Sequence, residues 1–98
     1  MKTANYIFRD FYIPEYMMEG IRRYIDHGQR PGRFLTAVIC NDLREACAMA
    51  DDVNIRNLPA YVAYFYNEAP SPCWGSREKM DEWIKIHYMR RISTEKNV

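Results

Sequence analysis

Eight residues between two helical patterns decide how this chain folds: His27-Gly28-Gln29-Arg30-Pro31-Gly32-Arg33-Phe34. Glycine readily adopts the left-handed backbone that ends a helix, so Gly28 predicts the end of the first helix. Pro31 and Gly32 predict a turn, with an arginine on each side of it at the start of the next helix. Backbone N–H groups at a helix start lack partners and carry the positive end of the helix dipole. The stretch therefore predicts a small anion-binding corner that prefers phosphate or carboxylate.

The apolar residues on both sides of this turn recur at helical spacing. Pro14 suits the first position of a helix, which we expect over residues 14–27. A central helix should begin after Pro31-Gly32. Its apolar positions show the strongest period in the chain: Leu35, Val38, Ile39, Leu43, Ala46, Cys47 and Ala50. Aspartate and asparagine over residues 51–54 then predict a polar break.

Two further helical patterns follow the break. The third helix should begin near Pro59 and end before Pro70. Its buried stripe is Tyr61, Val62, Phe65 and Ala69. Ser76 is a suitable N-cap for the fourth helix. The inward face of that helix is Met80, Trp83, Ile84 and His87.

A chain of 98 residues predicts a single domain with one modest core. Residues 1–13 are aromatic and β-branched without clean alternation, so we expect an extended N-terminal arm that packs on the bundle or on a neighbouring subunit. Residues 14–92 should form the helical core, and the polar tail over residues 93–98 should fray. The predicted fold is all-α, a compact bundle of about four helices with this N-terminal arm.

Composition and charge exclude several classes of protein. The formal net charge is +1, so no global field favours duplex DNA or an acidic membrane. With no charged leader before an apolar run and no stretch of about 20 apolar residues, we expect neither a signal peptide nor a membrane span. Eight tyrosines and two tryptophans suit partly wet interfaces, which favours a homo-oligomer. We expect a cytoplasmic location and no cofactor.

Arginines make the best candidate binding surface. Arg22, Arg23, Arg30 and Arg33 lie within twelve residues, opposed there only by Asp26. Guanidinium groups bind phosphate with two parallel N–H groups and stack on aromatic planes. The alternative is a solvated face or a set of internal ion pairs, with acidic partners among residues 42, 45 and 51.

Aromatic side chains further along the chain suggest stacking platforms for a nucleobase: Tyr61, Tyr64, Tyr66, Trp74 and Trp83. Base stacking of this kind is worth about 1–3 kcal/mol per base in single-strand binders. The alternatives are that these aromatics form the core or cover a protein partner. The predicted ligand-binding residues are therefore His27, Arg30, Gly32, Arg33, Tyr64, Tyr66 and Trp74.

Catalytic and metal sites receive little support from the sequence. Cys40, Cys47 and Cys73 show no CxxC spacing, and the first two should lie two turns apart on the central helix, too far to form a disulfide. Core thiols are favoured over a zinc site with His27 and His87.

Two catalytic alternatives remain open at this stage, and neither has a local signature. One is an exposed Cys73 thiolate with a histidine base, and the other is an acid/base pair of Glu68 and Asp42. The basic stretch over residues 85–91 suits a C-terminal helix, or contact with nucleic acid or an acidic protein. We expect no catalytic residue and no metal ligand.

A set of short motifs resembles a family of short bacteriophage and prophage proteins of unassigned function. The resemblance covers about residues 13–87. It is carried by Ile13-Pro14, Tyr24, His27-Gly28, Pro31-Gly32, Phe34-Leu35, Asn41-Asp42-Leu43, Ala50-Asp51, Tyr66-Asn67-Glu68-Ala69-Pro70 and Cys73-Trp74-Gly75-Ser76. It implies a protein that acts on host machinery or host immunity in the host cell cytoplasm, and it brings no catalytic assignment.

The predicted function is non-enzymatic binding against host defence. In its most concrete form, the arginine corner holds the phosphates of a nucleotide-derived immune signal while a Tyr or Trp side chain stacks on its base. One alternative is an inhibitor that binds a host defence protein or a nucleic-acid-processing complex. A further alternative is a small nucleic-acid-binding accessory protein.

Overall fold

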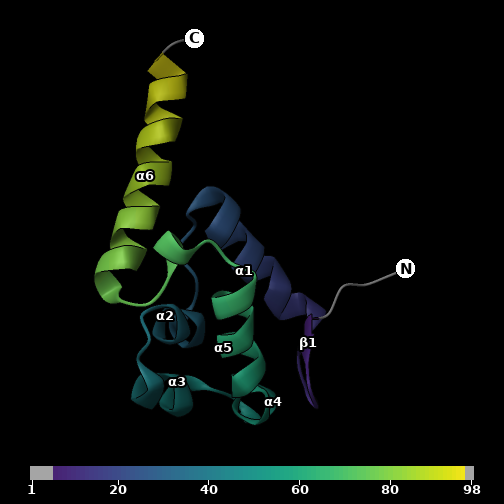
Figure 1. The fold of residues 1–98 in the computed structure, drawn as a ribbon. Coiled ribbons are helices and arrows are strands. Elements are labelled where there is room, and N and C mark those ends of the chain that lie inside the picture. Colours follow the sequence, from purple (N-terminus) through teal and green to yellow (C-terminus); the bar gives the residue numbers. More distant parts are fainter. Residues whose placement is uncertain (1–5, 97–98) are drawn as a thin grey trace.

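The computed structural model describes residues 6–96, which form a mostly helical fold (Figure 1). The elements in chain order are β1 (Tyr6–Phe8), β2 (Phe11–Ile13), α1 (Glu15–His27), α2 (Arg33–Ile39), α3 (Leu43–Met49), α4 (Asp52–Arg56), α5 (Leu58–Asn67), the 3₁₀ helix η1 (Ser71–Cys73) and α6 (Arg77–Lys96). The all-α prediction is confirmed, with more and shorter helices than expected in the middle of the chain.

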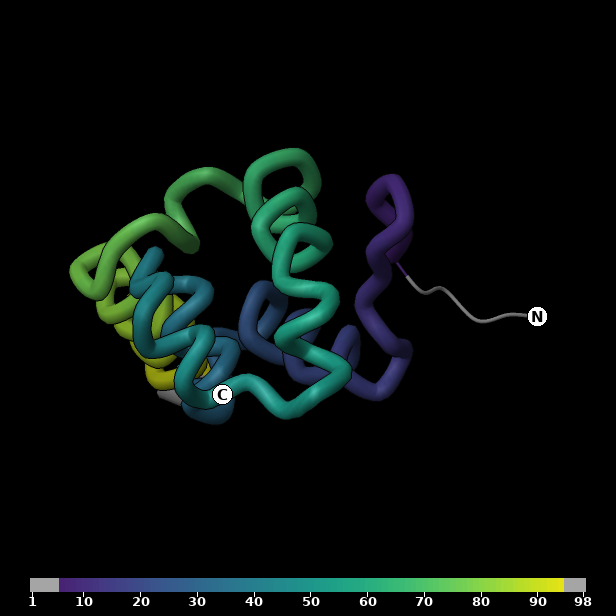
Figure 2. The backbone as a smooth tube through the Cα atoms, turned by 90° about the horizontal axis from the view of Figure 1, so that it is seen from below, coloured from purple at the N-terminus to yellow at the C-terminus, as the bar shows by residue number. Residues whose placement is uncertain are grey.

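The described part of the N-terminal arm is a β-hairpin. Strands β1 and β2 pair antiparallel with Phe8 opposite Phe11, and Arg9 takes a left-handed backbone (φ 56°) in the turn between them. The hairpin packs on α5, where the Tyr6 and Tyr64 rings meet edge to face at 5.2 Å. Figure 2 shows α5 standing between this hairpin and the α2–α3 pair. Residues 1–5 of the predicted arm lie outside the described residues.

The first helix matches its prediction. It begins after Pro14 and ends at Gly28, whose φ of 68° is the left-handed terminator expected there. Apolar side chains from α1, α2, α5, η1 and α6 then meet in one core, and the largest fully buried ones are Tyr24, Tyr61 and Phe65. The Tyr24 hydroxyl donates to the Cys73 carbonyl at 2.6 Å, and the Tyr61 hydroxyl donates to Asn54 Oδ1 at 2.7 Å. Both buried hydroxyls are therefore satisfied.

The prediction of one continuous central helix is wrong. The chain breaks between α2 and α3, where Asn41 takes a left-handed backbone (φ 62°) and the Asp42 side chain accepts from the Glu45 N–H to cap α3. The break turns α3 away from the expected buried stripe. As a result Leu43 is 66% exposed and Cys47 is exposed, while Ala46 stays buried. Cys40 and Cys47 belong to different segments rather than to one helix.

The predicted polar break after residue 50 also contains a helix. Asp51 caps the five-residue α4 by accepting from the Asn54 N–H at 2.8 Å. Helix α5 then begins at Leu58, with Pro59 in its first turn as predicted. The predicted burial of Tyr61 and Phe65 on this helix is confirmed, but Val62, also predicted to be buried, is 46% exposed. The apolar side chains of α5 therefore point to two sides, one of them open to solvent.

The last helix, α6, begins where predicted and runs further than predicted. The Ser76 hydroxyl accepts from the Lys79 N–H, which is the expected cap. Met80 is fully buried, and Trp83, Ile84 and His87 are half-buried. The helix continues through residues 93–96, where we expected a frayed tail, and residues 97–98 lie outside the described residues. Its second half projects from the body of the molecule (Figure 1).

Candidate functional site

Arginines from two distant parts of the sequence surround one hollow. Arg30 and Arg33 flank the Pro31-Gly32 turn as predicted, and Arg77 joins them from the start of α6. The hollow has a volume of about 390 Å³. Its lining is Arg30, Pro31, Gly32, Arg33, Thr36, Ala37, Cys40, Asp42, Glu45 and Arg77. We call it the arginine hollow. The presence of Arg77 in this hollow could not be predicted from the sequence, because nothing in the spacing of residues 33 and 77 indicates that they lie close together.

Carboxylates lie close to each arginine of the predicted cluster. Arg33 Nη2 is 3.4 Å from Glu45 Oε2, and Arg30 Nη2 is 4.0 Å from Asp81 Oδ1. Both pairs are largely exposed, so each contributes little to stability and is readily exchanged for another anion. In α1, Arg22 and Arg23 pair with Glu15 and Glu19. The internal ion pairs considered as an alternative are therefore present, with Glu45 among the predicted partners.

The helix dipole contributes less at this corner than the sequence suggested. The break at Asn41 limits α2 to seven residues, and Gly32 at its start has no side chain to cap it. The positive charge of the arginine hollow therefore comes from its three guanidinium groups. The surface beside Gly32 is open, since a Cβ there would have no atom within 4 Å.

The remaining predicted ligand-binding residues do not line the arginine hollow. His27 lies in a different hollow between α1 and α6. The Tyr64 ring meets Tyr6 and Phe65 edge to face, and burial raises its pKa. The half-buried Trp74 ring lies 6.1 Å from Phe65. These two aromatics are packed against the core, which matches the alternative interpretation.

Tyr66 is the exposed member of the aromatic set. It is 76% exposed on α5 and lines an apolar groove rather than the arginine hollow. Tyr61 is fully buried, and Trp83 donates its Nε1 proton to the Tyr24 and Ile25 carbonyls. Within residues 6–96 of one copy, no aromatic side chain therefore lines the arginine hollow.

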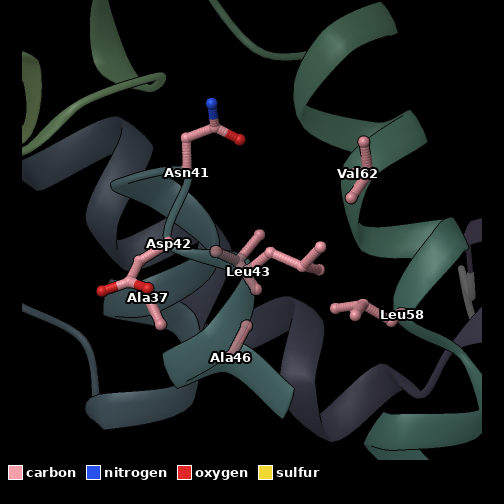
Figure 3. A pocket seen from close by; sticks show the side chains of 8 residues that line it. Ala37, Asn41, Asp42, Leu43, Ala46, Leu58 and Val62 are labelled. Carbon is pink, nitrogen blue, oxygen red and sulfur yellow. The ribbon is translucent and has the colours of Figure 1, made fainter.

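The apolar groove lies between α3 and α5 and reaches the β-hairpin. The groove has a volume of about 490 Å³. Its lining is Phe8, Leu43, Leu58, Pro59, Val62, Ala63, Tyr66 and Asn67. Figure 3 draws a smaller neighbouring pocket that shares Leu43, Leu58 and Val62 with the groove, and it shows Leu43 pointing from α3 toward Leu58 and Val62 of α5. Sequence reasoning missed this groove because it placed Leu43 and Val62 in the core.

The catalytic alternatives receive no geometric support from these positions. Cys73 is fully buried, and that burial raises the pKa of its thiol to about 11, so the thiolate is neither accessible nor favoured. Asp42 caps α3 and lines the arginine hollow, whereas Glu68 follows the last residue of α5 and does not line that hollow. Among the described residues no group of three His, Cys, Asp or Glu side chains is arranged to hold a metal ion.

Fold and surface together define a small helical protein with a cationic hollow beside the Pro31-Gly32 turn and an apolar groove between α3 and α5. Comparison of the chain with models of known families, with curated proteins and with solved structures gives no match. The resemblance to phage proteins therefore stays a prediction. Within the described residues, no helix combines the length and apolar character needed to cross a membrane.

Proposed function

We propose that this chain is a non-enzymatic binding protein that holds a phosphate-bearing ligand of the nucleotide class in the arginine hollow. The observation that carries the proposal is the convergence of Arg30, Arg33 and Arg77 on one concave surface. The hollow falls within the range of about 300–1,000 Å³ typical of small-molecule sites. Guanidinium groups from two elements can fork onto several phosphate oxygens at once.

Ligand entry requires only weak contacts to be exchanged. The Arg33–Glu45 pair is long and exposed, so a phosphate would replace a contact worth about 0–1 kcal/mol. Thr36 adds a hydroxyl to the lining of the hollow. In a homo-oligomer, the exposed Tyr66 of a neighbouring copy is the side chain we expect to contact the base, since the described lining of the arginine hollow contains no aromatic residue.

Thermal stability against a panel of linear and cyclic nucleotides tests the proposal. A ligand at about 100 times its dissociation constant should add about 2.7 kcal/mol to the free energy of unfolding. Arg33→Gln should abolish the shift, while Arg44→Gln should retain it. Arg44 is the matched control because it is an exposed arginine on α3 that does not line the hollow. No shift with any nucleotide would overturn the proposal.

Recovery of the ligand distinguishes binding from catalysis. A sequestering protein releases its nucleotide chemically unchanged after denaturation, whereas a hydrolase returns an altered product. Mass spectrometry of the released ligand makes this distinction. An altered product would move the chain to the class of enzymes.

The apolar groove favours a second candidate function, an inhibitor that binds a protein of the host. Leu43, Val62 and Tyr66 present adjoining exposed apolar surface, which in monomeric soluble proteins often marks an interaction site. This candidate predicts that Leu43→Asn abolishes partner binding and that Arg33→Gln leaves it unchanged. The nucleic-acid alternative instead predicts affinity that falls steeply with salt.

A further inference from the structure

A second hollow lies between the C-terminal end of α1 and the second half of α6, away from the arginine hollow. Its volume is about 580 Å³. Its lining is Asp26, His27, His87, Arg90, Arg91 and Thr94. We call it the histidine hollow. Figure 1 shows the second half of α6 passing the end of α1 and extending beyond it.

Close contacts hold the two walls of the histidine hollow in place. The backbone of Gly28 approaches α6 so closely that a Cβ built on it would lie 2.5 Å from His87 Cβ. One turn further along α6, Arg91 Nη1 donates to the His27 carbonyl at 2.9 Å. One turn earlier, Trp83 Nε1 donates to two carbonyl oxygens in the last turns of α1, at 3.2 Å each. The hollow is therefore preorganised by a continuous seam.

The lining of the hollow carries an excess of positive charge. Among the lining side chains that the structure describes, two guanidinium groups and two imidazoles face one carboxylate, that of Asp26. Among the side chains that the structure describes, no carboxylate forms a salt bridge with Arg90 or Arg91. Partial burial lowers the pKa of His87, and the neighbouring cations lower it further against the opposing effect of Asp26. The part of this shift that comes from Arg90, His27 and Arg91 is the part that favours a bound anion.

We propose that the histidine hollow is a phosphate-binding site, with Arg90 and the imidazoles of His27 and His87 as donors to the phosphate oxygens. Phosphate suits the site better than carboxylate because it has more acceptor oxygens and can accept from both helices at once. Arg91 has further N–H groups beside the one given to the His27 carbonyl. This site is independent of the function proposed for the arginine hollow.

The His87 imidazole makes this site sensitive to pH. When His87 gains a proton, it adds one positive charge and one N–H donor. Affinity for an anion should therefore rise as the pH falls from neutral through the pKa of His87, which lies below the ordinary histidine value. A bound anion in turn stabilises the charged imidazole, so it raises the pKa of His87.

Titration of the full chain with sulfate, followed by NMR of the histidine rings, tests the site. Sulfate stays a dianion over this pH range, so any pH dependence comes from the protein. We expect sulfate to raise the pKa of His87 relative to chloride at equal ionic strength. Arg90→Gln should weaken sulfate binding about tenfold, the loss expected for one charge-assisted hydrogen bond.

Two control variants separate a site from bulk charge and from the arginine hollow. Arg44→Gln removes the same charge from an exposed position on α3, and it should leave sulfate affinity unchanged. Arg33→Gln should leave the sulfate response of the His87 ring unchanged as well, although it abolishes binding in the arginine hollow. The proposed site would be wrong if Arg44→Gln lost as much sulfate affinity as Arg90→Gln. It would also be wrong if sulfate changed the pKa of His87 no more than chloride does.

Ligand size is tested with inorganic phosphate, a nucleoside monophosphate and the same nucleoside without phosphate, each followed through the NMR signals of the His87 ring so that binding in the arginine hollow is not counted. Binding of both phosphates and not of the nucleoside supports recognition of the phosphate group. Tighter binding of the monophosphate also supports the site and identifies nucleotides as its ligands. Binding of the nucleoside alone would overturn the proposal, because the base rather than the phosphate would then be recognised.

Discussion

Two apolar regions of this molecule differ in what covers them. Where α1, η1 and α6 meet, Tyr24, Cys73 and Met80 are fully buried, and the Tyr24 hydroxyl finds a carbonyl partner. Between α3 and α5, Leu43 is 66% exposed and Tyr66 is 76% exposed. The first region is a buried hydrophobic core, and the second has similar apolar side chains that remain exposed to solvent. The comparison indicates that the chain folds on the first region and keeps the second available for contact.

The sharpest form of this comparison lies within α5, at two neighbouring residues. Phe65→Ala empties a fully buried ring position and should lower the free energy of unfolding by about 3–5 kcal/mol. Tyr66→Ala removes an exposed ring and should change it by less than about 0.5 kcal/mol. Urea denaturation measures both. Similar losses for the two variants would break the comparison.

A second pair of variants tests how tightly the α1–α6 seam is closed. Gly28→Ala places a Cβ against His87 at a φ of 68°, so we expect a loss of about 2 kcal/mol or more. Gly32→Ala is the matched control, since its φ is −71° and its surroundings are open, and it should change stability by less than about 0.5 kcal/mol. Thermal unfolding measures the stability of both variants. If Gly28→Ala does not lower stability, the contact between Gly28 and His87 is not as close as the structure shows.

The cap of α3 decides how Leu43 is presented to solvent. Asp42→Ala removes the acceptor for the Glu45 N–H and should cost about 1 kcal/mol. Asp52→Ala, at an exposed position in the first turn of α4 that is not its cap, should cost less. Denaturant midpoints compare the two. If Asp42→Ala is neutral, the cap does not hold the start of α3.

The smallest expected effect on stability is at the groove itself. Leu43→Asn should change the free energy of unfolding by less than about 0.5 kcal/mol, because the side chain is already mostly in water. The same variant should reduce self-association or partner binding if the groove is an interface. Sedimentation velocity, with Arg44→Gln as the control, follows this effect. Loss of stability without loss of association would assign Leu43 to the core after all.

The helix ends could be predicted where one residue type alone decides the backbone. Gly28 ends α1, Pro59 stands in the first turn of α5 and Ser76 caps α6, all as expected. The break before α3 was missed because Leu43 continues the apolar period of α2. A cap signal was nevertheless present, since Asp42 precedes Glu45 by three residues, the spacing of a capping box.

The candidate sites depended on contacts that a single sequence does not encode. Arg30 and Arg33 are close in the sequence, so their shared hollow could be predicted, whereas the contribution of Arg77 could not. His27 and His87 are 60 residues apart in numbering, and only the packing of α6 on α1 brings them into one hollow. Tyr66 was predicted beside the arginines, but it lines the apolar groove instead.

The seam between α1 and α6 has a consequence for the order in which the chain folds. Its hydrogen bonds join residues that are 58 to 64 positions apart. During synthesis on the ribosome, the last carbonyl groups of α1 therefore cannot form these hydrogen bonds until α6 has been made. We expect the hairpin and helices α1 to α5 to collapse first and the docking of α6 to complete the native state.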